Sequence, residues 1–165
     1  MKQVEIERKY LIRMPSGILL SGLPSSQIEQ IYILSADGAA GRIRRRVYPD
    51  RIVCTHTTKK RLSDLSRIEI EEEIGEDRYA ELLQEADPKK SPIRKTRYLY
   101  RYRGQLFEID CFPFWDDRAL MEIEMEAEDQ QVCLPPDIEI IREVTSEKQY
   151  TNSAIAREIP REELP

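Results

Sequence analysis

Charged and apolar residues alternate with a period of two along most of this chain, beginning with VEIERKY at residues 4–10. Glu5, Glu7 and Lys9 fall on one side of an extended backbone, whereas Val4 faces the other side. This alternation indicates a β-strand with one charged and one apolar face. The chain is therefore constrained to form a sheet whose charged face either is solvated or lines a hydrated cavity.

Eight segments share this pattern and are predicted to be strands. Most of the links between them are short enough for hairpins, which favours an antiparallel sheet. The predicted strands cover residues 4–12, 27–35, 42–48, 51–60, 67–74, 94–103, 105–112 and 118–126.

Two other segments have helical periodicity. In residues 76–87 the apolar side chains recur at i, i+3, i+4 and i+7, and a proline follows. In residues 145–160, Ser146 and Gln149 have the spacing of a capping box, and a proline ends the run. Since no repeat or linker divides the chain, we expect a single α+β domain over residues 1–165.

The composition excludes several functional classes. Charged residues make up 35% of the chain, yet the net charge is only −5. This balance fits neither a polyanionic tail nor a basic nucleic-acid-binding surface, so we expect no nucleic-acid partner. The start of the chain is unlike a signal peptide, and no apolar run is long enough to span a membrane, so no membrane partner is expected. Three widely spaced cysteines without a zinc-binding pattern favour a reduced, cytoplasmic setting.

The charged faces of the predicted strands are sorted by sign. One strand carries Arg42, Arg44 and Arg46 together, whereas another carries Glu122 and Glu124. Like charges at this spacing of about 7 Å repel each other, so they do not stabilise a sheet by themselves. One explanation is a solvated outer face, and the alternative is an inner surface that binds a polyanion together with its cations.

Eight antiparallel strands can close into a barrel that is just wide enough for a small ligand. If the charged faces point inward, the guanidinium and ammonium groups suit phosphate oxygens. The carboxylates suit a hard cation such as Mg²⁺ or Mn²⁺. We therefore expect an eight-stranded antiparallel closed β-barrel with helices packed on its outside.

A series of segments, in order along the chain, resembles the CYTH superfamily, the triphosphate tunnel metalloenzymes. The segment EIERK has the E-x-E-x-K signature of that family. It is followed by RIRRR, TTKK, SRIEIEEEI, IRKTRY, GQLFEIDCF, LMEIEME and EVTSEKQYTNSAIA. The resemblance covers nearly the whole chain and is greatest to the short bacterial members, which consist of the tunnel domain alone. It implies a triphosphate tunnel with a C-terminal plug helix.

The resemblance also implies roles for individual residues of the charged faces. The divalent cation would be bound by Glu5, Glu7, Glu122 and Glu124. The triphosphate would be bound by Lys9, Arg42, Arg44, Lys59, Arg67, Lys95 and Arg97. The remaining inward-facing acids, which would order the basic groups, are Glu69, Glu71, Glu108 and Asp110.

Lys9 and Tyr32 are the predicted catalytic residues. Tyr32 matches a tyrosine that pairs with the signature lysine in the bacterial members. Either a second metal ion or Lys9, with its proton affinity lowered by neighbouring cations, would then activate the attacking water. The plug helix of the family contributes a basic side chain to one mouth of the tunnel. Because Gln149 stands at the position of that arginine, Lys148 is the candidate replacement.

Three side chains with reactive or aromatic groups remain outside the predicted site. By strand parity, His56 and Cys54 lie on the outer face of the sheet, so neither is predicted to act in catalysis. Trp115 could anchor a loop or line a mouth of the tunnel, and the sequence leaves both readings open.

The resemblance implies metal-dependent hydrolysis of the terminal phosphoanhydride of a linear triphosphate. Inorganic tripolyphosphate is favoured because the chain shows no extension that would bind a base or a thiazole ring. The alternatives are a CYTH-type adenylate cyclase, a thiamine or nucleoside triphosphatase and, from a different class, a non-catalytic module that binds polyphosphate or nucleotides. The predicted metal carboxylates argue against the last, since so many anions would weaken simple binding. Related proteins suggest a homodimer.

Overall fold

Nine antiparallel strands form the framework of the computed structural model, which describes residues 2–34 and 40–165, excluding the side chains of residues 2, 3, 40 and 59–61. The strands are β1 (Lys2–Arg13), β2 (Ser25–Leu34), β3 (Ala40–Val47), β4 (Ile52–Arg61), β5 (Ser66–Ile74), β6 (Ile93–Tyr102), β7 (Gln105–Cys111), β8 (Arg118–Glu124) and β9 (Ile140–Glu143).

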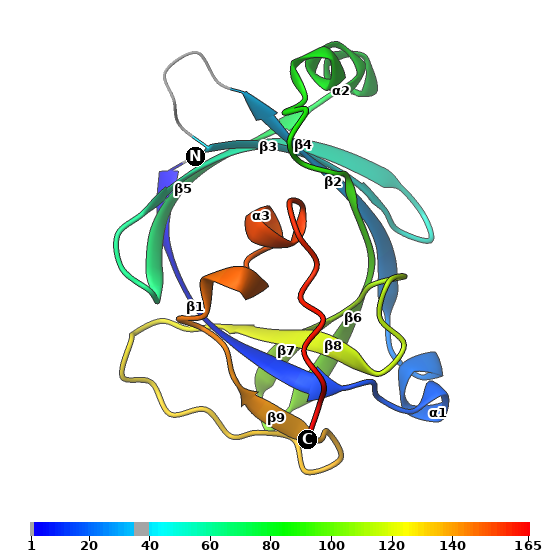
Figure 1. Ribbon diagram of the computed structural model, residues 1–165, viewed down its shortest axis with the longest axis vertical. Coiled ribbons are helices and arrows are strands. Elements are labelled where there is room, and N and C mark those ends of the chain that lie inside the picture. The colour runs from blue at the N-terminus through cyan, green and yellow to red at the C-terminus, as the bar shows by residue number, and fades with distance from the viewer. Residues whose placement is uncertain (1, 35–39) are drawn as a thin grey trace.

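Eight of these strands close into a barrel (Figure 1). Around the ring the order is β5, β4, β3, β2, β6, β7, β8 and β1, and β1 completes the ring by pairing with β5. Residues 2–6 of β1 pair with β5 along one edge, and residues 7–13 pair with β8 along the other edge. Strand β9 pairs with residues 10–12 of β1, beyond the point where β5 leaves it. The predicted closed antiparallel barrel is confirmed, with β9 as an additional strand.

The apolar outer face of β2, β3 and β4 is covered by a helix. This helix, α2 (Glu76–Leu82), continues into the 3-10 turn η1 (Leu83–Glu85). Tyr79 and Leu82 of α2 are buried against Ile43 and its neighbours on the sheet. The alternation of apolar residues therefore places one face of each strand beneath α2 and the charged face inside the barrel.

The part of the wall made by β7, β8 and β1 has a separate apolar layer on its outside. Phe107 and Met121 are completely buried there. They pack with Leu19 of the short helix α1 (Gly17–Ser21) and with Ile138 from the segment between β8 and β9. These two outer layers leave the interior of the barrel free for polar groups.

One end of the barrel interior is closed by a third apolar cluster. Leu11, Phe112 and Leu120 point inward with the same parity as the charged residues and pack with Tyr150 of the C-terminal segment. Trp115 belongs to this cluster, and its indole N–H donates to the main-chain oxygen of residue 160 at 3.0 Å. Trp115 thus anchors a loop and the C-terminal tail, which is one of the two readings that the sequence left open.

The C-terminal segment lies within the barrel outline as two short pieces, η2 (Lys148–Tyr150) and α3 (Asn152–Ile155) (Figure 1). The single helix predicted over residues 145–160 is therefore wrong. Thr151 interrupts it with an extended backbone (φ −71°, ψ 147°). This break allows Tyr150 to be completely buried in the inner cluster.

The capping box predicted for the C-terminal segment is also wrong. The residue that caps α3 is Thr151, whose Oγ1 accepts a hydrogen bond from the amide of Ala154 at 3.2 Å. The side chain of Gln149 donates instead to the carboxylate of Glu147. Thr151 and Asn152 favour a helix start at this point, because their side chains can hydrogen-bond nearby backbone groups that a continuous helix would use for its own hydrogen bonds.

The eight predicted strands are confirmed, with ends that differ by a few residues. Residue 35, at the end of the second predicted strand, lies outside the described residues. Strand β9 and helix α1 were not predicted, because four and five residues are too few to show a period. In the described part of the chain, no helix is long and apolar enough to cross a membrane.

The packing of α2 predicts a difference between two adjacent leucines. Leu82→Ala removes a side chain that is 2% exposed and leaves a cavity, so it should lower the free energy of unfolding by about 3 kcal/mol. Leu83→Ala, at a position that is 38% exposed, should lower it by less than about 1 kcal/mol. Urea denaturation measures both values, and equal losses would contradict the packing of α2 against the barrel.

Candidate functional site

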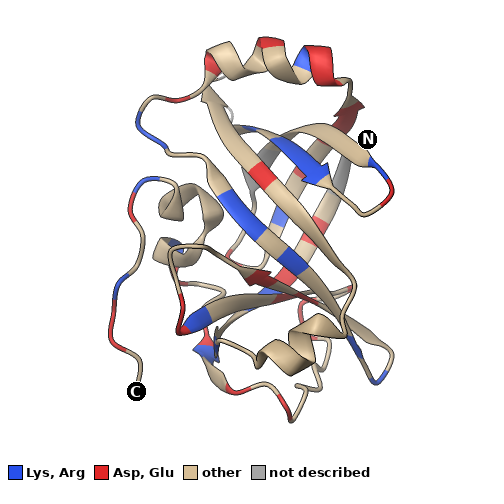
Figure 2. Ribbon diagram, turned by 90° about the vertical axis from the view of Figure 1, so that its right-hand side faces the viewer, with Lys and Arg blue, Asp and Glu red and all other residues tan. Residues whose placement is uncertain are grey.

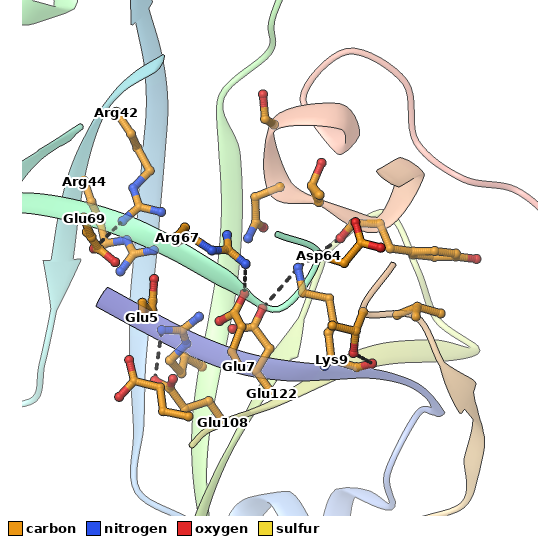
Figure 3. A pocket seen from close by; sticks show the side chains of 18 of the residues that line it. Glu5, Glu7, Lys9, Arg42, Arg44, Asp64, Arg67, Glu69, Glu108 and Glu122 are labelled. Carbon is orange, nitrogen blue, oxygen red and sulfur yellow. Dashed lines mark hydrogen bonds and ion pairs between the residues drawn. The ribbon is translucent and has the colours of Figure 1, made fainter. Parts of the chain in front are cut away.

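A cavity of about 530 Å³ lies inside the barrel, between the charged strand faces and the C-terminal segment. Figure 3 shows the side chains of this wall projecting inward from several strands. The charged faces therefore line an internal cavity. Of the predicted site residues, the wall contains Glu5, Glu7, Lys9, Tyr32, Arg42, Arg44, Arg67, Glu69, Glu71, Arg97, Glu108, Glu122 and Glu124.

Carboxylates gather on one side of the cavity, on the neighbouring strands β7, β8 and β1. The registers place Glu7 directly opposite Glu124 and Glu108 directly opposite Glu122. Figure 2 shows acidic and basic positions distributed over the strands of the barrel. Like charges at opposed positions destabilise a sheet, so this acidic side favours the binding of protons or cations.

The proton affinities of these acids reflect their crowding. Burial and the neighbouring Glu122 carboxylate raise the pKa of Glu7 to about 7, in spite of two nearby cations. Burial and a hydrogen bond with Glu5 raise the pKa of Glu124 to about 7. Two carboxyl groups of the acidic side thus hold protons close to neutral pH, because burial and neighbouring carboxyl groups disfavour their charged forms.

Arginines occupy a different side of the cavity, on β3 and β6. The guanidinium of Arg44 donates two hydrogen bonds to Gln30 Oε1, at 3.2 and 2.9 Å, and has no ion-pair partner among the described residues. Burial, Arg42 and Arg97 lower the pKa of Arg44 to about 9. Arg42 lies 3.8 Å from Glu69, and its buried Nε has no acceptor within the described part of the chain. This basic side can therefore accept further anionic oxygens.

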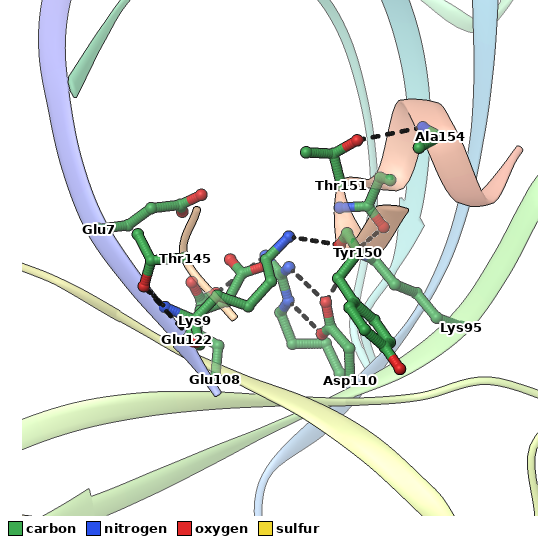
Figure 4. Close-up of polar contacts among 12 residues, drawn as sticks. Glu7, Lys9, Lys95, Glu108, Asp110, Glu122, Thr145, Tyr150, Thr151 and Ala154 are labelled. Atoms are coloured by element: carbon green, nitrogen blue, oxygen red, sulfur yellow. Dashed lines mark hydrogen bonds and ion pairs between the residues drawn. The ribbon is translucent and has the colours of Figure 1, made fainter. Parts of the chain in front are cut away.

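Lys9 lies close to the acidic side and to the C-terminal segment. Its Nζ is 3.3 Å from the Glu122 carboxylate and donates to the main-chain oxygen of Tyr150 at 3.1 Å (Figure 4). Burial by itself would lower the pKa of Lys9, but the carboxylates of Glu122 and Glu7 outweigh burial and raise it. The predicted lowering of its proton affinity is wrong, because the nearest charged groups are anions.

Two proteins that are named inorganic triphosphatases are similar to this chain in sequence over nearly its whole length. The chain is 31% identical to the inorganic triphosphatase of Nitrosomonas europaea over 160 residues, which cover 94% of this chain and 99% of that protein. It is 29% identical to the inorganic triphosphatase of Acetivibrio thermocellus over 154 residues, or 93% of each chain. No protein-family model matches the sequence.

The crystal structure of the inorganic triphosphatase NE1496 has the same barrel. It superposes with a TM-score of 0.62 at 30% identity and covers 95% of this chain and 100% of that one. The chain belongs to the CYTH superfamily. Its internal cavity corresponds to the triphosphate tunnel from which the superfamily takes its other name.

Tyr32 lies on the wall of this CYTH tunnel, but its hydroxyl accepts a hydrogen bond from Gln30 Nε2 at 3.1 Å. The Nζ of Lys90 is 4.7 Å from the centre of the tyrosine ring. The ammonium group of Lys9 contacts Glu122 and the main-chain oxygen of Tyr150 instead, so Tyr32 and Lys9 do not pair among the described residues. The predicted contact is absent in this arrangement of the CYTH tunnel.

Lys95 and Asp110 lie behind the tunnel wall, with side chains that are 0% and 2% exposed. The Asp110 carboxylate accepts from Lys95 Nζ at 2.7 Å and from two nitrogens of Arg97 at 2.7 and 2.8 Å (Figure 4). Although burial favours the neutral acid, Arg97 and Lys95 hold the pKa of Asp110 well below its usual range. Lys95 therefore supports Arg97 through Asp110, and its position does not match the predicted role as a phosphate ligand.

Two more of the predicted phosphate ligands belong to η2 and β4. The side chain of Lys148 is exposed on η2 and does not line the tunnel, so it does not replace the basic group of the plug. The side chain of Lys59 lies outside the described residues. Its backbone is part of β4, where it pairs with Glu69 of β5.

The sequence patterns do not reveal the wall that the C-terminal segment contributes. Thr145, Tyr150, Asn152 and Ser153 line the tunnel, yet their spacing follows neither a helical nor a strand period. Thr145 Oγ1 accepts from the main-chain amide of Lys9 at 3.1 Å, where β1 exchanges β5 for β9 as its neighbour. The resemblance implies that the segment EVTSEKQYTNSAIA plugs the tunnel, but neither it nor the polar run in this segment singles out these residues.

The acidic side of the tunnel fits a hard divalent cation by the type of its donors, because Mg²⁺ and Mn²⁺ prefer carboxylate oxygens. Within the described residues, no group of three or more histidine, cysteine, aspartate or glutamate side chains is placed to hold a metal. The carboxylates instead form pairs, such as Glu5 with Glu124. A cation at this site would therefore need ligands from phosphate and water in addition.

The Asp110 network predicts a pH-dependent stability. Asp110→Asn leaves the buried guanidinium of Arg97 and the buried amine of Lys95 without their carboxylate, and it should lower the free energy of unfolding by about 3 kcal/mol at pH 7. Because the pKa of Asp110 is depressed in the folded protein, its stabilisation is complete above the unfolded pKa of about 4 and declines as the pH falls below that value. The difference between the wild type and the variant should thus be about 1 kcal/mol smaller at pH 3.

Urea denaturation at pH 7 and pH 3 measures this difference. Asp50→Asn is the matched control, because Asp50 pairs with Arg51 on the exposed surface. Its effect should stay below about 0.5 kcal/mol at both pH values. A loss for Asp110→Asn that does not change with pH would contradict the depressed pKa.

Proposed function

We propose that this protein is a divalent-metal-dependent triphosphatase that hydrolyses the terminal phosphoanhydride of a linear triphosphate, with inorganic tripolyphosphate as its substrate. The observation that carries the proposal is the guanidinium of Arg44, which lies on the tunnel wall beside Arg42 and Arg97 without a carboxylate partner among the described residues. Such a cation gains most from a polyanionic ligand. The relatives named inorganic triphosphatases support the same substrate class.

The arginines of the basic side would position the triphosphate. Hydrolysis of a phosphoanhydride depends mainly on positioning and on neutralising the charge of the transferred and leaving groups. Arg42, Arg44 and Arg97 would donate to phosphate oxygens that become more negative in the transition state. Lys9, which Glu122 and Glu7 keep protonated, would bind a phosphate oxygen and would not serve as the base.

The carboxylates on the other side of the tunnel, Glu5, Glu7, Glu122 and Glu124, would hold Mg²⁺ or Mn²⁺. When bound, such a cation polarises phosphoryl oxygens and makes coordinated water more acidic. Glu7 and Glu124 would release their protons on binding it, which would relieve the repulsion between the opposed carboxylates. The acidic and the basic sides of the tunnel would thus neutralise the two ends of one metal–triphosphate complex.

The acidic side predicts metal-dependent turnover. Phosphate release from tripolyphosphate should require Mg²⁺ or Mn²⁺, stop in EDTA and return when the metal is restored. Glu5→Gln should lower kcat/KM by at least about 100-fold, since it removes a proposed metal ligand. The matched control is Glu72→Gln on the outer face of β5, where Glu72 lies 3.5 Å from His56, and it should leave kcat/KM unchanged. Full activity in EDTA would contradict the proposal.

The basic side predicts the contribution of Arg44. Arg44→Met should weaken tripolyphosphate binding by about 100-fold, because it removes a charged, forked donor from the tunnel. Arg45→Met is the matched control, since Arg45 is the next residue on β3 but faces outward and pairs with Glu76 at 3.1 Å. Calorimetric titration measures both affinities. Equal affinities of the two variants would contradict the role of Arg44, and binding without turnover in the wild type would indicate a non-catalytic site.

A further inference from the structure

Gln30 lies in the middle of β2, directly across from Arg44 on β3. It shares strand parity with Tyr32, yet it is completely buried and does not itself line the tunnel. Arg44 and Tyr32, which do line the tunnel, both contact its side chain. Gln30 thus forms a layer behind two of the groups that face the ligand.

The chemistry of the three side chains fixes the orientation of the Gln30 amide. A guanidinium can only donate hydrogen bonds, so the atom that contacts Arg44 Nε and Nη2 must be the amide oxygen. The amide nitrogen therefore faces Tyr32 and donates to its hydroxyl oxygen at 3.1 Å. In a flipped amide, the NH₂ group would face the donors of the guanidinium, and the tyrosine oxygen would lose its hydrogen-bond donor.

This orientation determines the role of the Tyr32 hydroxyl. Since the hydroxyl oxygen already accepts from Gln30, its own hydrogen is available for donation. That hydrogen has no acceptor among the described residues. Tyr32 thus presents an O–H donor, and Arg44 presents the remaining N–H donors of its guanidinium, on the same wall of the tunnel.

The amide also holds Arg44 without neutralising it. A glutamate would occupy nearly the same volume, but its carboxylate would accept from Arg44 and from the Tyr32 hydroxyl at once. Both donors would then be used within the protein, and the charge of Arg44 would be balanced before a ligand arrived. A neutral acceptor at position 30 leaves the charge and the hydroxyl hydrogen for an anion.

We propose that Gln30 is a positioning residue of the tunnel, which fixes Arg44 and Tyr32 as paired donors to the same phosphoryl group of the bound triphosphate. This inference rests on the proposed function for the identity of the ligand. Gln30 itself acts only through the other two side chains.

The test measures the binding of tripolyphosphate by calorimetry without divalent metal, together with the melting temperature of each variant. Gln30→Met keeps the length of the side chain but holds neither partner, and it should weaken binding by about tenfold. Gln30→Glu should weaken binding by about 100-fold, while its melting temperature equals or exceeds that of the wild type. A merely structural role would make the affinity follow the melting temperature, so a parallel fall of both in Gln30→Glu would overturn the proposal.

Ser26→Ala is the matched control on the same strand. Ser26 is also buried with inward parity, but its hydroxyl accepts from Arg46, which does not line the tunnel. This variant should bind tripolyphosphate within twofold of the wild type. A second comparison introduces Gln30→Met into a protein that already carries Arg44→Met and Tyr32→Phe. If Gln30 acts through these two residues, the added change should alter affinity by less than twofold, and a further tenfold loss would overturn the proposal.

These measurements separate the role of Gln30 from the proposed hydrolysis of tripolyphosphate. If the wild type binds tripolyphosphate but does not hydrolyse it with Mg²⁺ or Mn²⁺, the proposed function fails and the role of Gln30 is still decided by binding. If hydrolysis occurs and Gln30→Met binds as tightly as the wild type, only the role of Gln30 fails. No binding of tripolyphosphate by the wild type would overturn both.

Discussion

The inward direction of the charged strand faces is the constraint on which the rest of this protein depends. Pairing of β1 with β5 closes the sheet, so side chains of one parity have no access to bulk solvent except through the tunnel. Each charge on that face must then find a counter-charge, a proton or a ligand within the barrel. The apolar faces lie outside, where α2 and the segment between β8 and β9 cover them.

The charges inside the barrel are only partly balanced, and the unbalanced basic and acidic groups lie on different sides of the tunnel. The Asp110 carboxylate pairs with both Lys95 and Arg97, so its charge is balanced within the protein. Arg44, in contrast, is held by a neutral amide, and Glu7 and Glu124 hold protons near neutral pH. A protein that balanced all of these charges internally would be more stable, but it would offer no unbalanced group to a charged ligand.

The C-terminal segment links the apolar end of the barrel to the charged tunnel. Tyr150 is completely buried among inward-facing apolar residues, while its main-chain oxygen accepts from Lys9. Thr145 accepts from the amide of Lys9 at the point where β1 changes partners. The predicted helix fails here because burial of Tyr150 and a helix start capped by Thr151 outweigh the weak local preference for a continuous helix.

The sequence by itself determined the eight strands of the barrel, their antiparallel pairing and the identity of the charged faces, because a period of two is a local property that each segment carries independently. Only the tertiary structure decided which of those charges line the tunnel and which lie behind its wall, as the burial of Lys95 beside Asp110 demonstrates. The importance of Gln30 also appears only in three dimensions, since its partners Arg44 and Tyr32 are joined to it by strand register and burial. The proton affinity of Lys9 likewise depends on Glu122 of a distant strand, because Coulomb interactions follow distance in space and not along the chain.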